Sequence, residues 1–82
     1  MRQYLDQDKK TLEKVVCNRC GRELKLINGI VQEGVFQGET RWGYFSNRDG
    51  EHHTFDLCEE CYEHLLEAFL VPVTVEEVTE LL

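Results

Sequence analysis

Four cysteines arranged as two C-x-x-C pairs are the residues of this chain best suited to carry chemistry. They are all the cysteines of its 82 residues: Cys17, Cys20, Cys58 and Cys61. Two residues between the thiols let a tight turn aim both sulfurs at one point, and four thiolates form the closed tetrahedral shell of a structural zinc site. The spacing therefore predicts one structural zinc ion per chain bound by these four residues, with iron as the alternative metal.

The residues around each pair suit that prediction. Gly21 directly follows the first pair and can take the positive φ that such a turn often needs. Asp56 and Glu59 have the spacing of a capping box, which predicts a helix whose N-cap is Asp56. The second cysteine pair then lies near the start of that helix, with both thiols on one face.

The remainder of this helix is predicted from apolar residues at helical spacing, which are Tyr62, Leu65, Leu66, Phe69 and Leu70. Pro72 bars further propagation. A second capping box at Thr74 to Glu77 predicts a short helical tail over residues 74–82, too short to be stable unless it docks on the domain or on a partner.

The 37 residues between Cys20 and Cys58 exceed the about 15–20 of common zinc modules, so inserted β-hairpins must fill them. Asn28-Gly29 predicts a tight hairpin between strands at 23–27 and 30–31. A bulge or irregular loop is expected around residues 35–36. Strands follow at 40–46 and 51–57, joined by a turn at 47–50. The predicted core of this part consists of Trp42, Tyr44, Phe55 and Leu57, with an aromatic ligand platform as the less favoured interpretation.

The predicted fold is a small α+β domain of β-hairpins followed by a C-terminal helix and stabilised by zinc. Residues 11–16 suit either a last helical turn or a short strand leading into the first cysteine pair, and their β-branched residues favour the strand. Residues 1–11 form a polar N-terminal arm, for which a frayed helix and a disordered arm remain open. The division is then an arm at 1–11, a zinc-binding domain at 12–73 and a helical tail at 74–82.

A C-x-x-C-G knuckle, a hairpin and a C-x-x-C at a helix start resemble the treble-clef arrangement of zinc fingers and, more loosely, a zinc ribbon. The resemblance covers residues 17 to about 70. It implies zinc bound by the four cysteines. It implies no single function, because treble clefs serve in ribosomal proteins, nucleases, and lipid-binding and ubiquitin-related modules.

Two other uses of the cysteines are kept as alternatives. Rubredoxins also bind iron through two C-x-x-C pairs, and the first pair resembles half of such a site. The second pair departs from it, because Tyr62 rather than glycine follows Cys61. A thiol redox switch is the other alternative, in which oxidation of the pairs would release zinc and unfold the domain.

Catalysis is not expected. A catalytic zinc keeps an open coordination position, and four cysteines leave none. The histidines are His52, His53 and His64. The first two project to opposite faces of one predicted strand, so they cannot readily share a metal, whereas His64 could stand near the cysteines. The pair before Cys58 only faintly resembles an HNH-type nuclease, and solvent-facing or supporting roles are the expectation.

The charge distribution favours a protein partner or self-association over nucleic acid. The net charge is −7, divided into +3 over residues 1–48 and −10 over residues 49–82. Such an acidic chain is a poor general binder of phosphate backbones. A weak nucleic-acid interface remains the alternative, through a local patch of Arg19, Arg22 and Lys25 with Arg41 and Arg48 adjoining. The expected function is thus a zinc-stabilised protein-interaction or adaptor module.

No membrane segment or secretory signal is predicted. The first ten residues lack an apolar core, and the longest apolar run, residues 68–73, is far too short to cross a bilayer. A cytoplasmic location is expected, where paired cysteines more often bind metal than form disulfides.

Overall fold

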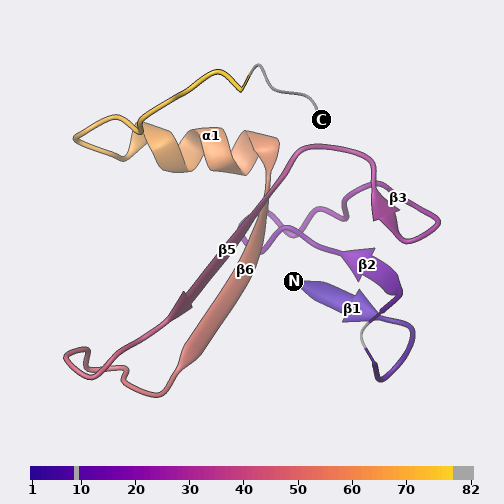
Figure 1. Ribbon diagram of the computed structural model, residues 1–82. Helices are drawn as coiled ribbons and strands as arrows, with labels where there is room; N and C mark the ends of the chain where they lie inside the picture. The colour runs from indigo at the N-terminus through magenta and orange to yellow at the C-terminus, as the bar shows by residue number, and fades with distance from the viewer. Residues whose placement is uncertain (9, 79–82) are drawn as a thin grey trace.

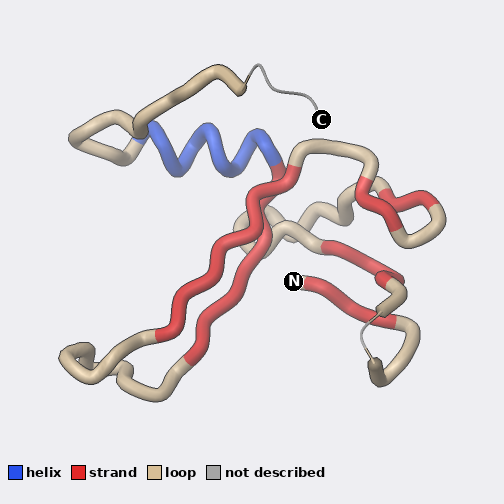
Figure 2. The backbone as a smooth tube through the Cα atoms, in the orientation of Figure 1, coloured by secondary structure: helices blue, strands red, loops and turns tan. Residues whose placement is uncertain are grey.

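The computed structural model describes residues 1–8 and 10–78, which fold into three antiparallel hairpins and one helix (Figures 1 and 2). The elements in chain order are β1 (Arg2–Tyr4), β2 (Leu12–Val15), β3 (Leu26–Ile27), β4 (Ile30–Val31), β5 (Val35–Arg41), β6 (His52–Cys58) and α1 (Glu59–Glu67). The predicted α+β class, with hairpins preceding a helix, is confirmed. No hydrogen-bonded ladder joins the three described sheets, so side-chain contacts and single backbone hydrogen bonds hold them together.

The N-terminal segment is a strand, which is neither of the two possibilities left open by the sequence. β1 pairs with β2, the strand expected within residues 11–16, in a register that places Arg2 opposite Val15. The connection is closed by the Asp6 carboxylate, which accepts hydrogen bonds from the backbone N–H groups of Lys10 and Thr11. Pairing with β2 explains why so polar a segment is extended, because the ladder satisfies the backbone N–H and C=O groups of β1.

The β3–β4 hairpin is confirmed where Asn28-Gly29 predicted it. Leu26 pairs with Val31 and Ile27 with Ile30. Asn28 has φ of 52° and Gly29 of 78°. Two consecutive positive φ values match the twist of a two-residue hairpin, and asparagine and glycine tolerate them best.

The β5–β6 hairpin is longer at its base than predicted. The bulge expected around Val35 and Phe36 is wrong, because both residues pair in register with β6, opposite Cys58 and Leu57. Gly38 does not break the strand either. The Phe55 ring of the neighbouring strand lies over it, where a Cβ would stand 2.5 Å from a ring carbon.

The strand expected over 40–46 is also largely wrong. β5 ends at Arg41, and most of residues 42–51 form the turn that joins the two strands. Backbone pairing continues only to Trp42, whose N–H donates to the carbonyl of Glu51 at 3.0 Å. The strand predicted at 51–57 is confirmed as β6.

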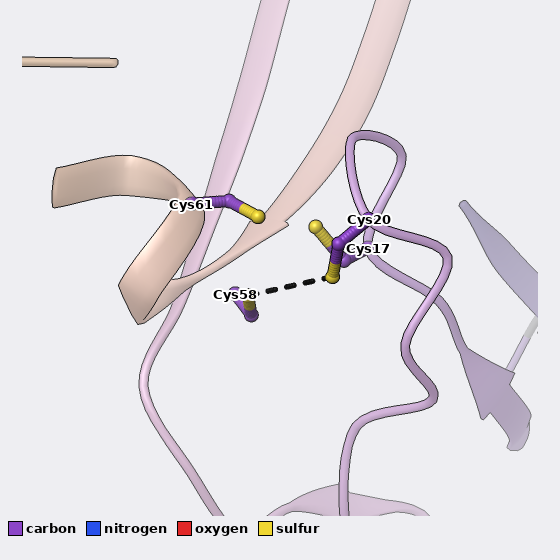
Figure 3. A group of neighbouring side chains, drawn as sticks. All are labelled: Cys17, Cys20, Cys58 and Cys61. Carbon is purple, nitrogen blue, oxygen red and sulfur yellow. Dashed lines mark hydrogen bonds between the residues drawn. The ribbon is translucent and has the colours of Figure 1, made fainter. Parts of the chain in front are cut away.

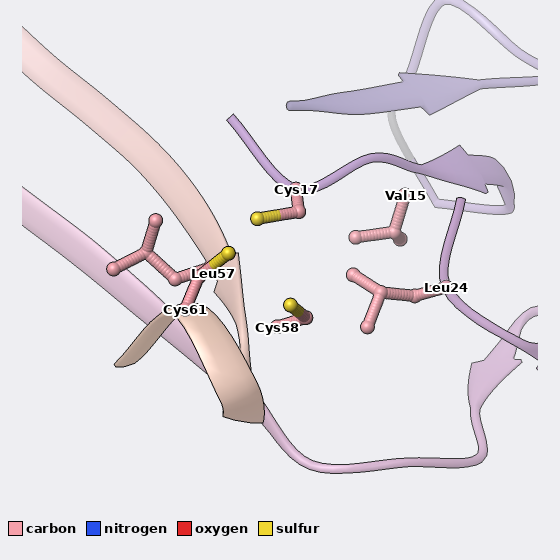
Figure 4. Close-up of a cluster of buried hydrophobic side chains, with 6 residues drawn as sticks. All are labelled: Val15, Cys17, Leu24, Leu57, Cys58 and Cys61. Carbon is pink, nitrogen blue, oxygen red and sulfur yellow. The ribbon is translucent and has the colours of Figure 1, made fainter. Parts of the chain in front are cut away.

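The buried core lies at the base of this hairpin and consists of Val15, Cys17, Leu24, Leu57, Cys58 and Cys61 (Figure 4). Of the aromatic core predicted from sequence, only Leu57 is buried. Trp42 and Phe55 are more than a third exposed, and Tyr44 is 83% exposed. The reason is geometric, because β5 and β6 project away from the other sheets and carry their far end out of reach of the core (Figure 1).

Helix α1 starts two residues later than predicted. Its N-cap is Cys58, with no side-chain capping bond, so the assignment of Asp56 as N-cap is wrong. Asp56 instead belongs to β6 and is buried. The helix ends at Glu67, before Pro72, so Phe69 and Leu70 lie beyond it in an exposed segment.

The described residues after α1 contain no further helix. Residues 74–78, the described portion of the predicted helical tail, have no helical turn, and residues 79–82 lie outside the described part of the chain. Within the described residues, no helix has the length and apolar character needed to cross a membrane.

Candidate metal centre

The structure brings the four cysteines together. Their sulfurs all lie within 4.8 Å of one another, and those of Cys20 and Cys58 are 3.9 Å apart (Figure 3). A tetrahedral ion with metal–sulfur bonds of about 2.3 Å requires sulfurs about 3.8 Å apart. The cluster therefore has nearly the dimensions of a four-coordinate metal site before any ion is considered, and its donor set fits a thiophilic metal.

The first pair is held in a tight knuckle that follows β2. The N–H of Gly21 donates to the carbonyl of Cys17 at 2.9 Å, and the N–H of Cys17 donates to the carbonyl of Arg22 at 2.9 Å. Gly21 has φ of 79°, the left-handed conformation expected from sequence. The turn points the sulfurs of the first pair toward β6 and α1 (Figure 3).

Two hydrogen bonds fasten this knuckle to β6 without metal. The N–H of Asn18 donates to the carbonyl of Asp56 at 2.7 Å, and the N–H of Asp56 donates to the Asn18 side-chain oxygen at 3.0 Å. Asp56 is two residues before Cys58, so these bonds set the distance between the two cysteine pairs. The hydrogen bonds and the cysteine cluster therefore join the same two segments of the chain.

The buried Asp56 carboxylate ties the N-terminal hairpin to the same point. Asp56 is only 4% exposed, and its two oxygens accept from the Arg2 guanidinium and the Met1 amino group, each at 3.0 Å. The amino group also donates to the carbonyl of Val16 at 2.7 Å and to the side chain of Asn18. Sequence reasoning missed this role. The available signal was an aspartate within a strand, where the residue is disfavoured unless it has a partner.

Three of the four cysteines are buried, and the thiols of the same three have shifted pKa values. Cys17, Cys58 and Cys61 are buried, whereas Cys20 is exposed. Burial disfavours the Cys17 thiolate, but backbone N–H groups of Cys20, Cys58 and Arg19 outweigh it and lower the pKa of Cys17 to about 6. The pKa of Cys58 is also lowered, chiefly by the backbone N–H of Cys61.

Cys61 behaves in the opposite way. The Arg19 side chain favours its thiolate, but burial and the neighbouring thiols of Cys58, Cys17 and Cys20 outweigh that effect and raise the pKa of Cys61 to about 12. Crowded like charges make the last thiol hard to ionise. A bound divalent cation would offset the repulsion between the four thiolates, and its binding would release the remaining thiol protons.

Two of the three basic residues proposed as a nucleic-acid patch are engaged within the fold. The Arg19 guanidinium donates to the sulfur of Cys61 at 3.5 Å, and this contact raises the pKa of Arg19. Arg22 makes two hydrogen bonds to the Glu33 carboxylate, at 2.7 and 3.2 Å, which raise the pKa of Arg22 and lower that of Glu33. Glu33 also accepts the backbone N–H of Lys25 at 2.6 Å. The patch is therefore partly neutralised by the fold itself.

The histidines do not join the cysteine cluster in the described residues. His52 lies 2.8 Å from the Glu39 carboxylate, and His53 accepts the Trp42 indole N–H at 3.1 Å while its other nitrogen lies 2.8 Å from Glu51. His64 is 3.7 Å from Glu67 on α1. Each imidazole thus has a local carboxylate partner.

Comparisons with protein-family models, with curated proteins and with solved structures find no match to this chain.

Proposed function

We propose that this chain is a zinc-stabilised interaction module in which one zinc ion, held by the four cysteines, is structural. The observation that carries the proposal is the composition of the core. Three of its six buried residues are cysteines, and the other three are Val15, Leu24 and Leu57. Five more apolar side chains pack against this core but are only partly buried, so the apolar core is small for a domain of this size. Metal binding contributes about 10–16 kcal/mol in zinc-finger peptides.

The treble-clef arrangement is part of this proposal. The first pair lies in a knuckle after a strand, and the second supplies the N-cap and the first turn of α1. That helical placement supports zinc over a rubredoxin-like iron site, whose two pairs both lie in knuckles. Four cysteine ligands leave no open coordination position on a tetrahedral ion, which supports a structural ion rather than a catalytic one.

An interaction role is supported by what lies away from the metal centre. Large apolar side chains are exposed on the hairpin turn and after α1, including Tyr44, Phe45, Leu70, Val71 and Val75. Tyr44 and Phe45 contact each other, and an exposed apolar cluster of this kind supports a protein-binding surface. Nucleic acid is disfavoured because the chain is acidic and because Arg19 and Arg22 are engaged with Cys61 and Glu33.

The test is metal analysis of protein purified without added metal, combined with circular dichroism before and after a strong chelator. We expect one zinc per chain, no visible absorption, and loss of secondary structure on chelation that added zinc reverses. A Cys61→Ser variant should bind metal far more weakly, whereas Ser46→Ala, in the distant turn, should match the parent. A metal-free chain that is fully folded would overturn the proposal. A coloured protein would show that the four cysteines bind iron rather than zinc.

A further inference from the structure

A small groove lies where β5 begins beside the first turn of α1. It has a volume of about 240 Å³ and is lined by Gly34, Val35, Phe36, Glu59 and Tyr62. The rings of Phe36 and Tyr62 lie against each other in this lining, with centroids 5.0 Å apart and planes inclined by 30°. Phe36 is 37% exposed. The groove therefore has an aromatic wall that remains accessible from outside.

The Glu59 carboxylate lies in the same groove. A Cβ at position 34 would collide with Glu59 Oε1, so the glycine at this position leaves room for the carboxylate. Glu59 is exposed, and it forms no ion pair with a described basic residue. The groove thus combines two aromatic rings with a carboxylate that has no cationic partner in the described part of the chain.

The helix beside the groove extends this negative charge. α1 contains four glutamates and no lysine or arginine. Glu60 and Glu63 are exposed and, like Glu59, form no ion pair with a basic residue among those that the structure describes. Acidic residues at a helix start interact favourably with the helix dipole, which accounts for their presence there. The dipole explains neither the groove nor the rings beside Glu59.

We infer that this groove binds an arginine side chain in a basic segment of a protein partner. The face of an aromatic ring attracts a guanidinium, and the apolar stem of arginine can lie along apolar surface such as Val35. A carboxylate can accept two hydrogen bonds from one guanidinium, which is the role of Glu59. Glu60 and Glu63, within about one turn of Glu59 on α1, then face further basic residues of the same segment.

The class of partner follows from charge. Residues 49–82 have a charge of −10, which attracts a cationic segment and repels the phosphates of nucleic acids and of anionic lipids. A purely apolar segment seated in the groove would cover the Glu59 carboxylate without pairing it, which is unfavourable. The inference rests on the proposed interaction role and names the chemistry that its partner must have.

The test measures the fluorescence anisotropy of a labelled peptide of alternating arginine and glycine during titration with the zinc-loaded chain. The control peptide has citrulline in place of arginine, which keeps the shape of the side chain and removes its charge. We expect saturable binding of the arginine peptide that weakens as salt is added. The citrulline peptide should bind about tenfold more weakly, because it lacks the charge-assisted hydrogen bonds.

Two variants test the groove itself. Glu59→Gln keeps the shape of the side chain and removes its charge, and it should weaken binding of the arginine peptide about fivefold. Phe36→Leu keeps an apolar side chain and removes the ring, and it should weaken binding about threefold. The matched control is Glu13→Gln, which neutralises an exposed glutamate of β2 and should bind like the parent. All three variants should keep their zinc and their circular dichroism spectra.

Three results would overturn the inference: no binding of the arginine peptide, equal binding of the arginine and citrulline peptides, or tighter binding of a labelled oligonucleotide than of the arginine peptide. Equal effects of Glu59→Gln and Glu13→Gln would overturn it as well, because overall charge alone would then attract the peptide. Each of these results leaves the proposed zinc-stabilised module standing, because that proposal depends on metal content and on the effect of chelation.

Discussion

Arg19 occupies an unusual position for a basic residue in an acidic chain, because its guanidinium is directed at a sulfur rather than at a carboxylate. A divalent ion with four thiolates leaves a net charge of about −2 on the centre, and cations close to the sulfurs offset it. Arg19 donates to Cys61, the thiol whose ionisation is most strongly opposed by its neighbours. Arg19 therefore favours the thiolate form of Cys61.

We therefore expect Arg19→Ala to lower zinc affinity about 10–100-fold, the range typical of groups that hydrogen-bond to metal ligands. The measurement is a competition titration against a chromophoric chelator. Arg41→Ala is the matched control, because it removes the same charge at the far end of β5, and it should leave the affinity unchanged. Equal affinities for parent and Arg19→Ala would show that the contact with Cys61 does not support the centre.

The β5–β6 hairpin depends on a contact that neither strand reveals alone. Gly38 has no side chain, and the Phe55 ring of the opposite strand fills the space above it. The glycine would weaken an isolated strand, but the ring restores the lost packing. This pair explains how β5 accommodates Gly38 within seven residues of regular strand.

Gly38→Ala should destabilise the zinc-loaded chain by about 1–3 kcal/mol, because its Cβ would stand 2.5 Å from the Phe55 ring. Denaturant unfolding measures the change. In a Phe55→Ala background the same substitution should cost little, so that the two changes are strongly non-additive. Gly43→Ala is the control, since its Cβ would meet nothing within 4 Å. Additive effects would contradict the contact.

Elements governed by local chemistry could be predicted from the sequence, and those governed by tertiary contacts could not. Asn28-Gly29 determines its hairpin because the two backbone conformations are a property of those residues. The cysteine cluster is the exception, a tertiary contact that could be predicted because two C-x-x-C pairs together are typical of a single metal site. The spacing of Asp56 and Glu59 predicts a helix cap at Asp56. In the structure the Asp56 carboxylate instead accepts hydrogen bonds from Arg2 and the Met1 amino group, which are distant in sequence.

The aromatic residues show the same limit in another form. Alternation along β6 correctly gave the two faces of the strand, but it could not say which part of the hairpin reaches the core. Leu57 lies at the base and is buried, whereas Phe55 is already more than a third exposed and Trp42 lies near the turn. Burial here depends on distance from the cysteine cluster, and the sequence pattern contains no measure of that distance.

The molecule as a whole consists of three two-stranded hairpins that are not joined by any β-ladder among the described residues, together with one helix. β2 leads into the first pair, and β6 and α1 carry the second, so the cysteine cluster connects the N-terminal hairpin to the β5–β6 hairpin and the helix. A two-stranded hairpin is marginal in water by itself. The β5–β6 hairpin should therefore depend on the metal along its full length, including the turn farthest from the site.

Trp42 provides a test, because it is the single tryptophan and lies near that turn. During a chelator titration we expect the Trp42 emission and the far-ultraviolet circular dichroism to change together. Loss of the indole hydrogen bond to His53 would then accompany loss of the fold at the base. A change in circular dichroism while Trp42 emission stays constant would show that the hairpin folds independently of the metal centre.

The separation of the cysteine pairs along the chain has a consequence for biosynthesis. Cys20 and Cys58 are 38 residues apart, and ribosomes add about 5–20 residues per second, so the first pair waits about 2–8 s for its partners. During that interval two nascent thiols have only half of a ligand set and are open to oxidation or to capture by another metal. We therefore expect maturation of the proposed metal centre to require reducing conditions and available metal while the polypeptide is still being made.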